Sequence, residues 1–424
     1  MEITPLDGWI REKTGLSELS GAALENYHHE KLRAIVTYAK TRSRFYRALF
    51  ADYSDIDSLT DFCALPFTLP SDIKNSPNDF LCVPPDSISR IVTLRTSGTT
   101  GGSKRVFFTK EDQELTIDFF EQGMSTFTER GDSTLVFMPG ETPGSVGDLL
   151  VRGLTRLGAR SLVYGPISDY ADASRALFKC VPDVVVGLPS QVFRLARETA
   201  GKCEVKTVLL ASDYMPQALL SAISSCWGCE VFSHYGLTET GLGGAVTCKA
   251  AAGYHLREND LFFEIVDTES GRPVQNGEPG EIVVTTLNHR GMPLIRYRTG
   301  DRSRILTQPC HCGSDLRRLD RIIGRMQEPL QLHSGCELSI TTLDDIIYRY
   351  NGISAYSAYL TDCSSGDELL VITIMQTDAR AELPVIPELD TLPVKAVLTT
   401  GEPCFFTTGA AKRLIEDRRA APPL

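Results

Sequence analysis

The sequence lacks any apolar run approaching the roughly 20 residues that a membrane-spanning helix needs. It also lacks long basic runs, internal repeats and low-complexity tracts. The N-terminal segment MEITPLDGWIREKTG has no basic stretch followed by an apolar one, which is the pattern of a secretion signal. A formal net charge of −11 disfavours nucleic acid as the main partner. These absences predict a cytoplasmic protein that has neither a nucleic-acid nor a membrane partner.

Cysteine is present, with twelve residues, but the cysteines are scattered and do not have the spacing of a disulfide framework. In a chain without a secretion signal they are predicted to be reduced thiols, some of which can bind metal. The 424 residues are 42% hydrophobic and 23% charged, which is typical of a globular protein. At about 150 residues per domain, the length predicts two or three domains.

Short apolar runs alternate with amphipathic segments between residues 131 and 233, which predicts a parallel sheet covered by helices. A helix is also expected over residues 22–50. The expected strands are Leu135–Met138, Ser161–Tyr164, Val184–Leu188, Thr207–Ala211 and Glu230–Ser233, and the expected helices lie near 146–157, 171–180, 190–199 and 216–226.

The pattern changes after residue 260 to short strands separated by turn residues, which predicts an antiparallel, barrel-like or edge-sheet region. The expected strands there are Leu261–Val266, Glu281–Thr286, Pro293–Tyr297 and Ser303–Leu306. Beyond it we expect a helix near 341–350 and strands near 353–360, 369–375 and 394–399. The fold class is therefore α/β, with a large domain over 1–325, a β-rich part at about 245–325, and a small α+β domain over 326–424.

The run TSGTTGGSK, Thr96 to Lys104, lies between two apolar, strand-like segments. Glycines let a backbone approach a ligand closely, consecutive N–H groups and hydroxyls can surround phosphate oxygens, and the lysine adds a cation. The spacing of a Walker loop, G-x-x-x-x-G-K-(S/T) before a helix, is absent. The segment therefore indicates a phosphate loop of another kind, or else an ordinary turn.

Two further segments contain residues suited to a nucleotide. SHYGLTETG follows the last strand of the alternating block, where ligands of open α/β sheets bind. There Tyr235 can stack on a base, Thr238 can meet a phosphate, and Glu239 can hold Mg²⁺. In the later segment YRTGD, Asp301 suits the two hydroxyls of a ribose. The alternatives are a common Tyr-Gly turn with an exposed glutamate, and an Asx-type turn at the aspartate.

In this order the three segments resemble the motifs of the adenylate-forming superfamily of acyl-CoA synthetases, peptide-synthetase adenylation domains and luciferases. Those motifs read (S/T)SG(S/T)TGxPK, YGxTE and YRTGD, and here Gly102-Ser103 stands where x-Pro is usual. The chain is most similar to the phenylacetate–CoA ligase branch over most of its length. The similar segments are KLRAIVTYAKTRSRFYRALF, Leu65-Pro66-Phe67-Thr68 with Asp72-Ile73, GEIVVTTLNHRGMPLIRYRTGD and Arg321-Ile322-Ile323-Gly324-Arg325.

The resemblance implies a large nucleotide domain with a small mobile lid, and activation of a carboxylic acid by ATP and Mg²⁺. An acyl-adenylate forms, and a thiol, usually coenzyme A, then displaces AMP. The loop would hold the β- and γ-phosphates, Thr238 the α-phosphate, Glu239 the Mg²⁺ and Asp301 the ribose, with Arg325 close by. The residues that the resemblance places around the nucleotide are Thr96, Ser97, Gly98, Thr99, Thr100, Gly101, Lys104, Ser212, Asp213, His234, Tyr235 and Gly236.

The C-terminal segment departs from this family. A catalytic lysine is usual there in a pattern like GKAxRVxD, and the lysine position falls on Ala410. Lys412 lies two residues away, which on a strand is the same face but about 6–7 Å along it. Lys412, or else Lys395, is the expected stand-in. Prolines in residues 376–393 oppose the helix that is usual in this part of the family.

Cys248, His255, Cys310 and Cys312 form two Cys/His pairs beside expected strands. Three thiolates and one imidazole would complete a closed tetrahedral Zn²⁺ site. The spacing is not that of a standard zinc finger, although some phenylacetate–CoA ligase relatives carry a similar set. Structural zinc and unliganded buried thiols both remain open.

The expected function is therefore an AMP-forming acid–thiol ligase. The acid is expected beside two glycine-containing stretches, 137–147 and 234–244, and His234 is a candidate for that pocket. Transfer to a carrier protein, an amine or another acceptor is the first alternative, and a nucleotide-binding protein without ligase activity is the second. The identity of the acid and the oligomeric state stay open, although relatives are often dimers.

Overall fold

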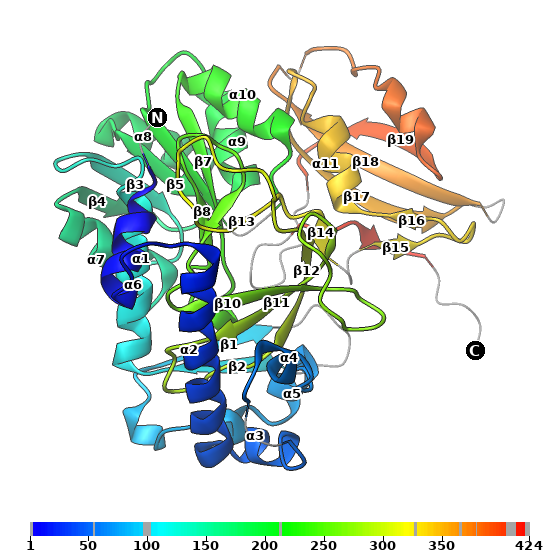
Figure 1. Ribbon diagram of the computed structural model, residues 1–424. Coiled ribbons are helices and arrows are strands. Elements are labelled where there is room, and N and C mark those ends of the chain that lie inside the picture. The colour runs from blue at the N-terminus through cyan, green and yellow to red at the C-terminus, as the bar shows by residue number, and fades with distance from the viewer. Residues whose placement is uncertain are drawn as a thin grey trace. The chain divides into compact units, whose positions relative to one another are not determined.

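The computed structural model of the protein describes residues 3–53, 56–95, 103–211, 214–325, 329–363, 367–378, 380–403 and 413–419 (Figure 1). The chain forms two compact units. Unit 1 combines Met1–Pro166 with Phe232–Ile323, and unit 2 combines Ile167–Val231 with Gly324–Leu424. The domain boundary expected after residue 325 stays a prediction. In the described parts of the chain, no helix is both long enough and apolar enough to cross a membrane.

The first part of unit 1 is helical, and the single helix predicted over 22–50 is divided in two. α2 (Gly21–Arg42) is followed by α3 (Arg44–Leu49), because Ser43 has extended backbone angles and its side chain accepts a hydrogen bond from the Tyr46 N–H. Such a serine ends one helix and caps the next. The other α-helices of unit 1 are α1 (Pro5–Thr14), α4 (Leu59–Cys63), α5 (Pro70–Asn75), α6 (Lys110–Met124) and α7 (Val146–Leu157).

Unit 1 contains one of the predicted strand–helix–strand repeats. β3 (Ser133–Phe137) and β4 (Arg160–Val163) pair in parallel, and α7 lies between them in the chain. α7 ends at Gly158, whose φ of 84° is left-handed, a conformation that glycine adopts without strain. The prediction for this stretch is confirmed.

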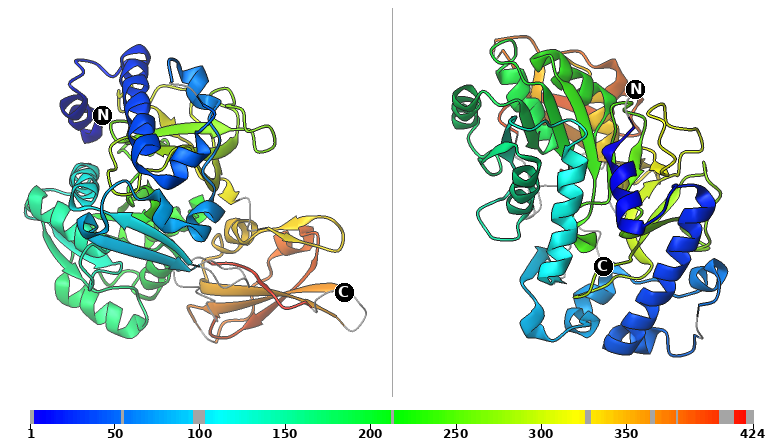
Figure 2. Two further views of the ribbon diagram at one scale, coloured as in Figure 1. Left: turned by 90° about the horizontal axis from the view of Figure 1, so that it is seen from below. Right: turned by 60° about the vertical axis from the view of Figure 1, so that its left-hand side comes forward.

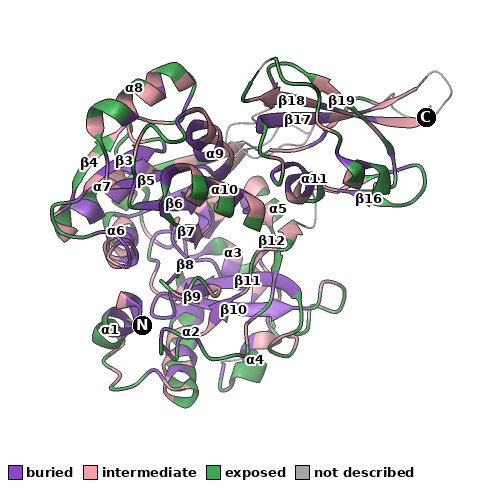
Figure 3. Cartoon of the chain, turned by 90° about the horizontal axis from the view of Figure 1, so that it is seen from above, coloured by how far each residue is buried: buried purple, intermediate pink, exposed green. Residues whose placement is uncertain are grey.

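An antiparallel sheet follows in the same unit, in the order β10 (Leu261–Val266), β11 (Gly280–Thr286) and β12 (Tyr297–Ser303). β10 and β11 are buried along their whole length (Figure 3). They confirm the first two predicted strands. The predictions of separate strands at Pro293–Tyr297 and Ser303–Leu306 are wrong, because one strand occupies 297–303 instead.

Arg296 explains where β12 begins. Its φ is 47°, a left-handed value that interrupts an extended strand. The side chain holds that turn from within the core, since its guanidinium donates to Glu264 at 2.9 and 3.2 Å and to the carbonyls of Cys63 and Leu65. The chain therefore bends before Tyr297 and becomes a strand after it.

A second antiparallel ladder in unit 1 begins at the C-terminal end of β7 (Glu230–Tyr235). There His234 pairs with Val246 of β8 (Ala245–Thr247). β9 (Tyr254–Leu256) pairs with β8, and β13 (Arg318–Leu319) pairs with β9. This ladder brings residues near 235, 247, 255 and 318 to one part of the unit.

Unit 2 contains the parallel pair β5 (Val184–Gly187) and β6 (Thr207–Ala211), with Val184 opposite Thr207. The predicted alternation with helices is confirmed. The helices of this stretch are α8 (Tyr170–Cys180), α9 (Pro189–Glu198) and α10 (Gln217–Trp227).

The C-terminal part of unit 2 is an α+β sheet in the order β19-β18-β17-β20. Its α-helix α11 and the adjoining α9 are joined through the rings of Tyr348 and Phe193, whose centroids lie 4.7 Å apart. Between 376 and 393 the described residues form only the 3-10 turn η4 (Pro387–Thr391), in line with the predicted effect of the prolines. The elements are β14 (Gly324–Arg325), β15 (Leu330–Gln331), β16 (Glu337–Leu338), α11 (Ile340–Ile347), β17 (Ile353–Asp362), β18 (Glu368–Gln376), β19 (Lys395–Thr400) and β20 (Glu416–Asp417).

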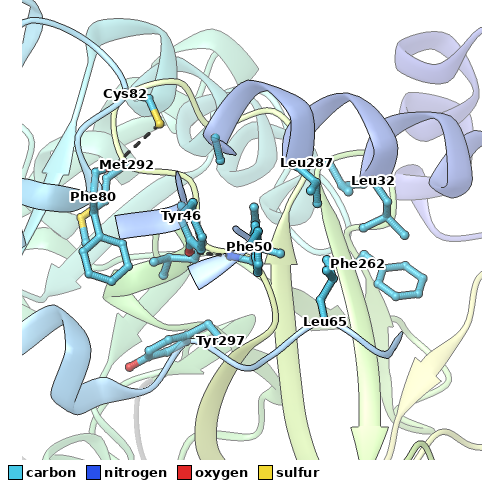
Figure 4. Packing of buried hydrophobic residues seen from close by; sticks show 14 of the residues in the cluster. Leu32, Tyr46, Phe50, Leu65, Phe80, Cys82, Phe262, Leu287, Met292 and Tyr297 are labelled. Atoms are coloured by element: carbon cyan, nitrogen blue, oxygen red, sulfur yellow. Dashed lines mark hydrogen bonds between the residues drawn. The ribbon is translucent and has the colours of Figure 1, made fainter. Parts of the chain in front are cut away.

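One hydrophobic cluster joins the N-terminal helices of unit 1 to its antiparallel sheet (Figure 4). α2 runs beside β10 and β11 (Figures 1 and 2), and His28 of α2 packs edge-on against Phe262 at 5.2 Å. Tyr46, Phe50 and Tyr297 belong to the same cluster. The start of β12 is therefore fixed inside a packed core.

Candidate functional site

The glycine-rich segment lies between two paired strands. β1 (Arg90–Arg95) and β2 (Ser103–Phe108) are antiparallel, with Arg95 opposite Ser103. This confirms the two predicted flanking strands, and Ser103 and Lys104 begin a strand, whereas a Walker loop opens a helix. The described part of the motif includes Lys104, on β2. The expected phosphate-binding residues Thr96, Ser97, Gly98, Thr99, Thr100 and Gly101 lie outside the described residues.

Lys104 meets the expected Mg²⁺ ligand directly. Its Nζ forms a short charged hydrogen bond with Oε1 of Glu239, which lies on the 3-10 turn η3 (Thr238–Thr240). The Tyr297 hydroxyl donates to the same Oε1 at 2.9 Å and accepts from Lys104 Nζ at 3.3 Å. The structure thus brings two predicted residues and one unpredicted residue together.

The surroundings of Glu239 keep it ionised. Burial alone would raise the pKa of its carboxyl, but the Lys104 ammonium and the Tyr297 hydroxyl outweigh this effect and lower the pKa. A buried carboxylate that holds its charge beside a cation can accept a metal ion once that cation moves.

Tyr235 and Asp301 form the second part of the site. The Tyr235 hydroxyl donates to Asp301 Oδ2 at 3.0 Å, and both side chains are buried. Asp301 lies within β12, between Arg298 and Arg302, which both pair with β11. The Asp301 N–H donates to Thr299 Oγ1 at 3.1 Å, and this hydrogen bond helps to fix the backbone of Asp301.

Glu281 supports this part of the site and was missed in the sequence. Its Oε2 accepts from Arg298 Nε at 2.7 Å, and its Oε1 accepts from the Gly300 N–H at 3.0 Å. Gly300 has a φ of 77°, so the strand is locally irregular just before Asp301. A glutamate at the start of the apolar run EIVVTT is the signal, because a buried carboxylate needs partners.

His234 lies apart from the Tyr235–Asp301 pair, as the alternation of side chains along a strand requires. Its ring centroid is 5.9 Å from Phe119 and 6.2 Å from Phe120, both on α6. Burial lowers its pKa to about 4, with the charge of Arg257 acting in the same direction. The imidazole is therefore neutral, and its buried Nε2 has no hydrogen-bond partner among the described residues.

The glycines around YGLTE serve close packing. A Cβ on Gly236 would lie 1.7 Å from the Leu242 carbonyl oxygen, so only glycine fits there. A Cβ on Gly243 would lie 2.2 Å from the Phe119 ring, and one on Gly140 would lie 2.5 Å from a neighbouring valine. Neighbouring atoms likewise lie within 4 Å of a Cβ on each of Gly140, Gly144, Gly147, Gly241, Gly243 and Gly244, and the acid pocket expected beside 137–147 and 234–244 stays a prediction.

Several expected residues cannot be placed. Ser212, Asp213, Ala410 and Lys412 lie outside the described residues, as does the side chain of Arg325. In unit 2 the described chain resumes at Arg413, whose guanidinium donates to Asp344 at 2.5 Å and to the Tyr348 hydroxyl at 2.6 Å. The alternative lysine, Lys395, is exposed at the start of β19.

The four predicted zinc ligands converge in unit 1. The donor atoms of Cys248, His255, Cys310 and Cys312 all lie within 4.8 Å of one another, and all four residues are buried. Cys248 Sγ lies 3.6 Å from Cys310 Sγ, and Cys312 Sγ lies 3.5 Å from His255 Nε2. Three sulfurs and one imidazole nitrogen form a donor set that suits tetrahedral zinc.

Arg318 joins the two segments that carry these ligands. Its guanidinium donates to the carbonyls of Ala252 and Gln308, one beside each pair of ligands. Burial lowers the pKa of His255 to about 4, so its imidazole is neutral and able to bind a metal. The four side chains thus lie in the interior of unit 1, and Arg318 holds together the two segments that carry them.

The chain is similar to known CoA ligases in sequence and in fold. The chain is 27% identical to a phenylacetate–coenzyme A ligase of Thermus thermophilus over 74% of this chain and 73% of the relative. It is 28% identical to a phenylacetate–coenzyme A ligase of Aromatoleum evansii over 82% and 79%. Its fold is that of a 2-hydroxyisobutyryl-CoA ligase solved in the postadenylation state, with a TM-score of 0.79, 19% identity, and coverage of 96% and 92%.

The family assignment comes from a match to the AMP-binding enzyme model over residues 33–288. This range contains Lys104, Tyr235, Glu239 and the antiparallel strands β10 and β11. It covers more than half of the chain. The protein belongs to the AMP-binding enzyme family.

Proposed function

We propose that the protein activates a carboxylic acid with ATP and transfers the acyl group to coenzyme A. A carboxylate oxygen of the acid attacks the α-phosphate, and pyrophosphate leaves. The thiol then attacks the acyl carbon of the adenylate, and AMP leaves. The meeting of Lys104 with Glu239 in unit 1, together with the Tyr235–Asp301 pair, carries this proposal.

Each side chain has a distinct task in this reaction. The ammonium of Lys104 neutralises phosphate oxygens, and Thr238 contacts the α-phosphate. Asp301 accepts hydrogen bonds from the ribose hydroxyls, and Tyr235 lies beside the adenine. These groups mainly position ATP and stabilise charge, which is how an enzyme assists attack at phosphorus. The remaining proposed contacts come from Thr96, Ser97, Gly98, Thr99, Thr100, Gly101, Ser212, Asp213, His234, Gly236 and Arg325.

The site suits Mg²⁺ through Glu239. Mg²⁺ prefers oxygen ligands and in nucleotide sites takes one or two carboxylates together with phosphate oxygens and water. Glu239 offers a buried, ionised carboxylate beside the lysine that is expected to contact phosphate. When bound, the metal ion would supply charge for the phosphates of ATP.

The names of the relatives support coenzyme A as acceptor and an aryl or acyl acid as substrate. Both reported relatives are phenylacetate–coenzyme A ligases, and the solved neighbour is also a CoA ligase. A carrier thiol or an amine is the competing acceptor. The choice of acid depends on the side chains around His234, whose neutral ring and unused Nε2 favour an acid that can donate a hydrogen bond.

An exchange assay tests the proposal. Labelled pyrophosphate is incubated with ATP, Mg²⁺, the protein and a panel of aryl and aliphatic acids. Acid-dependent exchange shows adenylation, and release of AMP on addition of coenzyme A, compared with a carrier-protein thiol, identifies the acceptor. Absence of ATP binding would overturn the proposal, whereas binding without exchange for any acid would favour the nucleotide-binding alternative.

The lid lysine is tested separately. We propose that Lys412 replaces the lysine that the family has at the position of Ala410, so adenylation is slow while thioester formation is less affected. Ala410→Lys is expected to raise exchange by more than about tenfold, equivalent to ~1.4 kcal/mol. Lys412→Ala is expected to abolish exchange, whereas the matched control Lys395→Ala should keep it. Unchanged rates in the first two variants would contradict the assignment.

We further propose that Cys248, His255, Cys310 and Cys312 bind one structural Zn²⁺. The support is their convergence within 4.8 Å in a buried region. The His255 Nε2 faces the cluster, as a ligand atom must. Zinc there would fasten the segment after β8 to the segment before β13.

Elemental analysis of protein purified without a metal-affinity tag measures this directly. About one zinc per chain is expected, with a large loss of thermal stability on chelation because metal binding contributes to folding. Cys310→Ser should lose the metal, whereas Cys336→Ser, at an exposed cysteine, should keep it. Negligible zinc together with unchanged stability on chelation would establish unliganded thiols instead.

A further inference from the structure

The hydroxyl of Tyr297 contacts both charged residues of the site, Lys104 and Glu239. We propose that Tyr297 is a positioning residue that holds Glu239 in place while Lys104 exchanges that carboxylate for the phosphates of ATP. The inference rests on the proposed function, since it needs a nucleotide and a divalent cation. It adds a residue that acts through Glu239 rather than on the substrate.

The three side chains share one oxygen atom. Lys104 Nζ and the Tyr297 hydroxyl both donate to Glu239 Oε1, and the hydroxyl in turn accepts from Lys104 at 3.3 Å. The ammonium also lies 6.0 Å from the centre of the Tyr297 ring. A carboxylate has two oxygens and about four acceptor positions, so one donor on Oε1 leaves capacity for a metal ion.

Binding of ATP with Mg²⁺ would give Lys104 a reason to leave Glu239. A dication at Glu239 repels the nearby ammonium, and the phosphates offer it new anionic partners. Once Lys104 moves, Oε1 loses its charged donor. The tyrosine hydroxyl then remains as the donor that keeps the buried carboxylate oriented, because an unsupported buried charge is costly.

Tyr297 can do this because its own position is fixed. The residue is 2% exposed and belongs to the core cluster shown in Figure 4. Its backbone pairs with Val284 of β11, and the preceding Arg296 is locked by Glu264. Glu239, by contrast, lies on a 3-10 turn of three residues. A rigid strand residue therefore supports a carboxylate on a short turn.

The decisive variant is Tyr297→Phe, which removes only the hydroxyl. The matched control is Tyr46→Phe, in the same cluster. The Tyr46 hydroxyl is also buried, but its hydrogen-bond partners are the Ile295 N–H at 2.9 Å and Thr68 Oγ1 at 3.0 Å rather than Glu239. Both variants lose a buried phenol hydroxyl, so both are expected to lower the unfolding temperature.

Calorimetry with ATP, in EDTA and over a series of Mg²⁺ concentrations, separates the two variants. Wild type is expected to bind ATP more tightly with Mg²⁺. For Tyr297→Phe, the Mg²⁺ concentration that gives half of the increase in ATP affinity should be about tenfold higher than for wild type. This is the effect expected when a charged group loses one hydrogen bond. Its affinity in EDTA should stay that of wild type. Tyr46→Phe should keep the Mg²⁺ dependence of wild type.

Two results would overturn the inference alone. In the first, Tyr297→Phe keeps the Mg²⁺ dependence of wild type. In the second, Tyr46→Phe loses it equally, which would trace the effect to damage of the core. If wild type binds no ATP with or without Mg²⁺, the proposed function fails and takes this inference with it, and the failure of wild type itself identifies that case.

Discussion

Two of the ion pairs in unit 1, Arg296–Glu264 and Lys104–Glu239, differ in how firmly they are held. Arg296 gives Glu264 two hydrogen bonds and gives two more to the carbonyls of Cys63 and Leu65. Its side chain is 2% exposed. The side chain of Lys104 is 16% exposed, and among the described residues its ammonium donates hydrogen bonds to Glu239 and the Tyr297 hydroxyl alone.

The difference shows which pair is structural and which is functional. A planar guanidinium with four fixed acceptors cannot leave without breaking a turn of the backbone. A lysine ammonium on a flexible stem, at the edge of solvent, can move to another anion at little cost. We call Arg296–Glu264 the fixed pair and Lys104–Glu239 the exchangeable pair. Tyr297 follows Arg296 in the chain and contacts Lys104 and Glu239, so the fixed pair anchors a residue that contacts the exchangeable pair.

The largest effect is expected at the fixed pair. Arg296→Met should lower the free energy of unfolding by about 3–5 kcal/mol, because Glu264 is left as a buried charge without its partner. Urea unfolding measures it. Arg304→Met, which breaks an exposed pair with Asp320, is the control and should cost less than about 1 kcal/mol. Equal losses in the two variants would remove the distinction between fixed and exchangeable pairs.

At the exchangeable pair, the loss of activity should be large and the loss of stability small. Lys104→Met is expected to reduce adenylation by roughly 100- to 1,000-fold, the usual result of removing one group that stabilises developing charge. The stability loss should stay below about 2 kcal/mol, since the lysine is partly exposed and Glu239 keeps the Tyr297 hydroxyl. Exchange kinetics and urea unfolding on the same samples give both numbers. Full activity, or a loss of stability as large as that of Arg296→Met, would contradict this view.

The sequence was informative where function requires a fixed motif. TSGTTGGSK, YGLTE and YRTGD identified Lys104, Glu239 and Asp301, and the structure brings Lys104 to Glu239 and Asp301 to Tyr235. The Cys/His spacing likewise located four donors that meet. Such motifs are readable because each residue type has its own chemistry.

The sequence failed where long-range packing decides the outcome. The strand expected at Pro293–Tyr297 does not form, because Arg296 takes a left-handed conformation, and its side-chain partners Glu264, Cys63 and Leu65 lie far away in the chain. The support of Asp301 by Glu281 depends on the register of two strands, which local pattern does not fix. The close approach of Gly243 to Phe119, on α6, likewise depends on packing between segments far apart in the chain.

A smaller effect is expected at the ribose carboxylate. Asp301→Ala should weaken ATP binding by about 1–3 kcal/mol, because the ribose hydroxyls lose their acceptor. Tyr235→Phe removes the hydrogen bond to Asp301 but keeps the carboxylate, so it should weaken binding less. Calorimetry with ATP compares the two. Wild-type affinity in Asp301→Ala would show that the nucleotide does not lie where we propose.

The smallest effect is expected in the pH dependence of stability. The folded-state pKa of Glu239 is lowered, so its carboxylate contributes stability above the ordinary glutamate value of about 4.3, and that contribution is lost as pH falls through the folded-state value. Acidification from about pH 5 downward should therefore destabilise wild type more than Glu239→Gln, which has no carboxyl to protonate. The exposed Glu269→Gln serves as the control and should follow wild type. Thermal unfolding across this range provides the measurement. Parallel curves for wild type and Glu239→Gln would mean that Lys104 does not hold the carboxylate in its charged form, and the exchangeable pair would then lose its electrostatic basis.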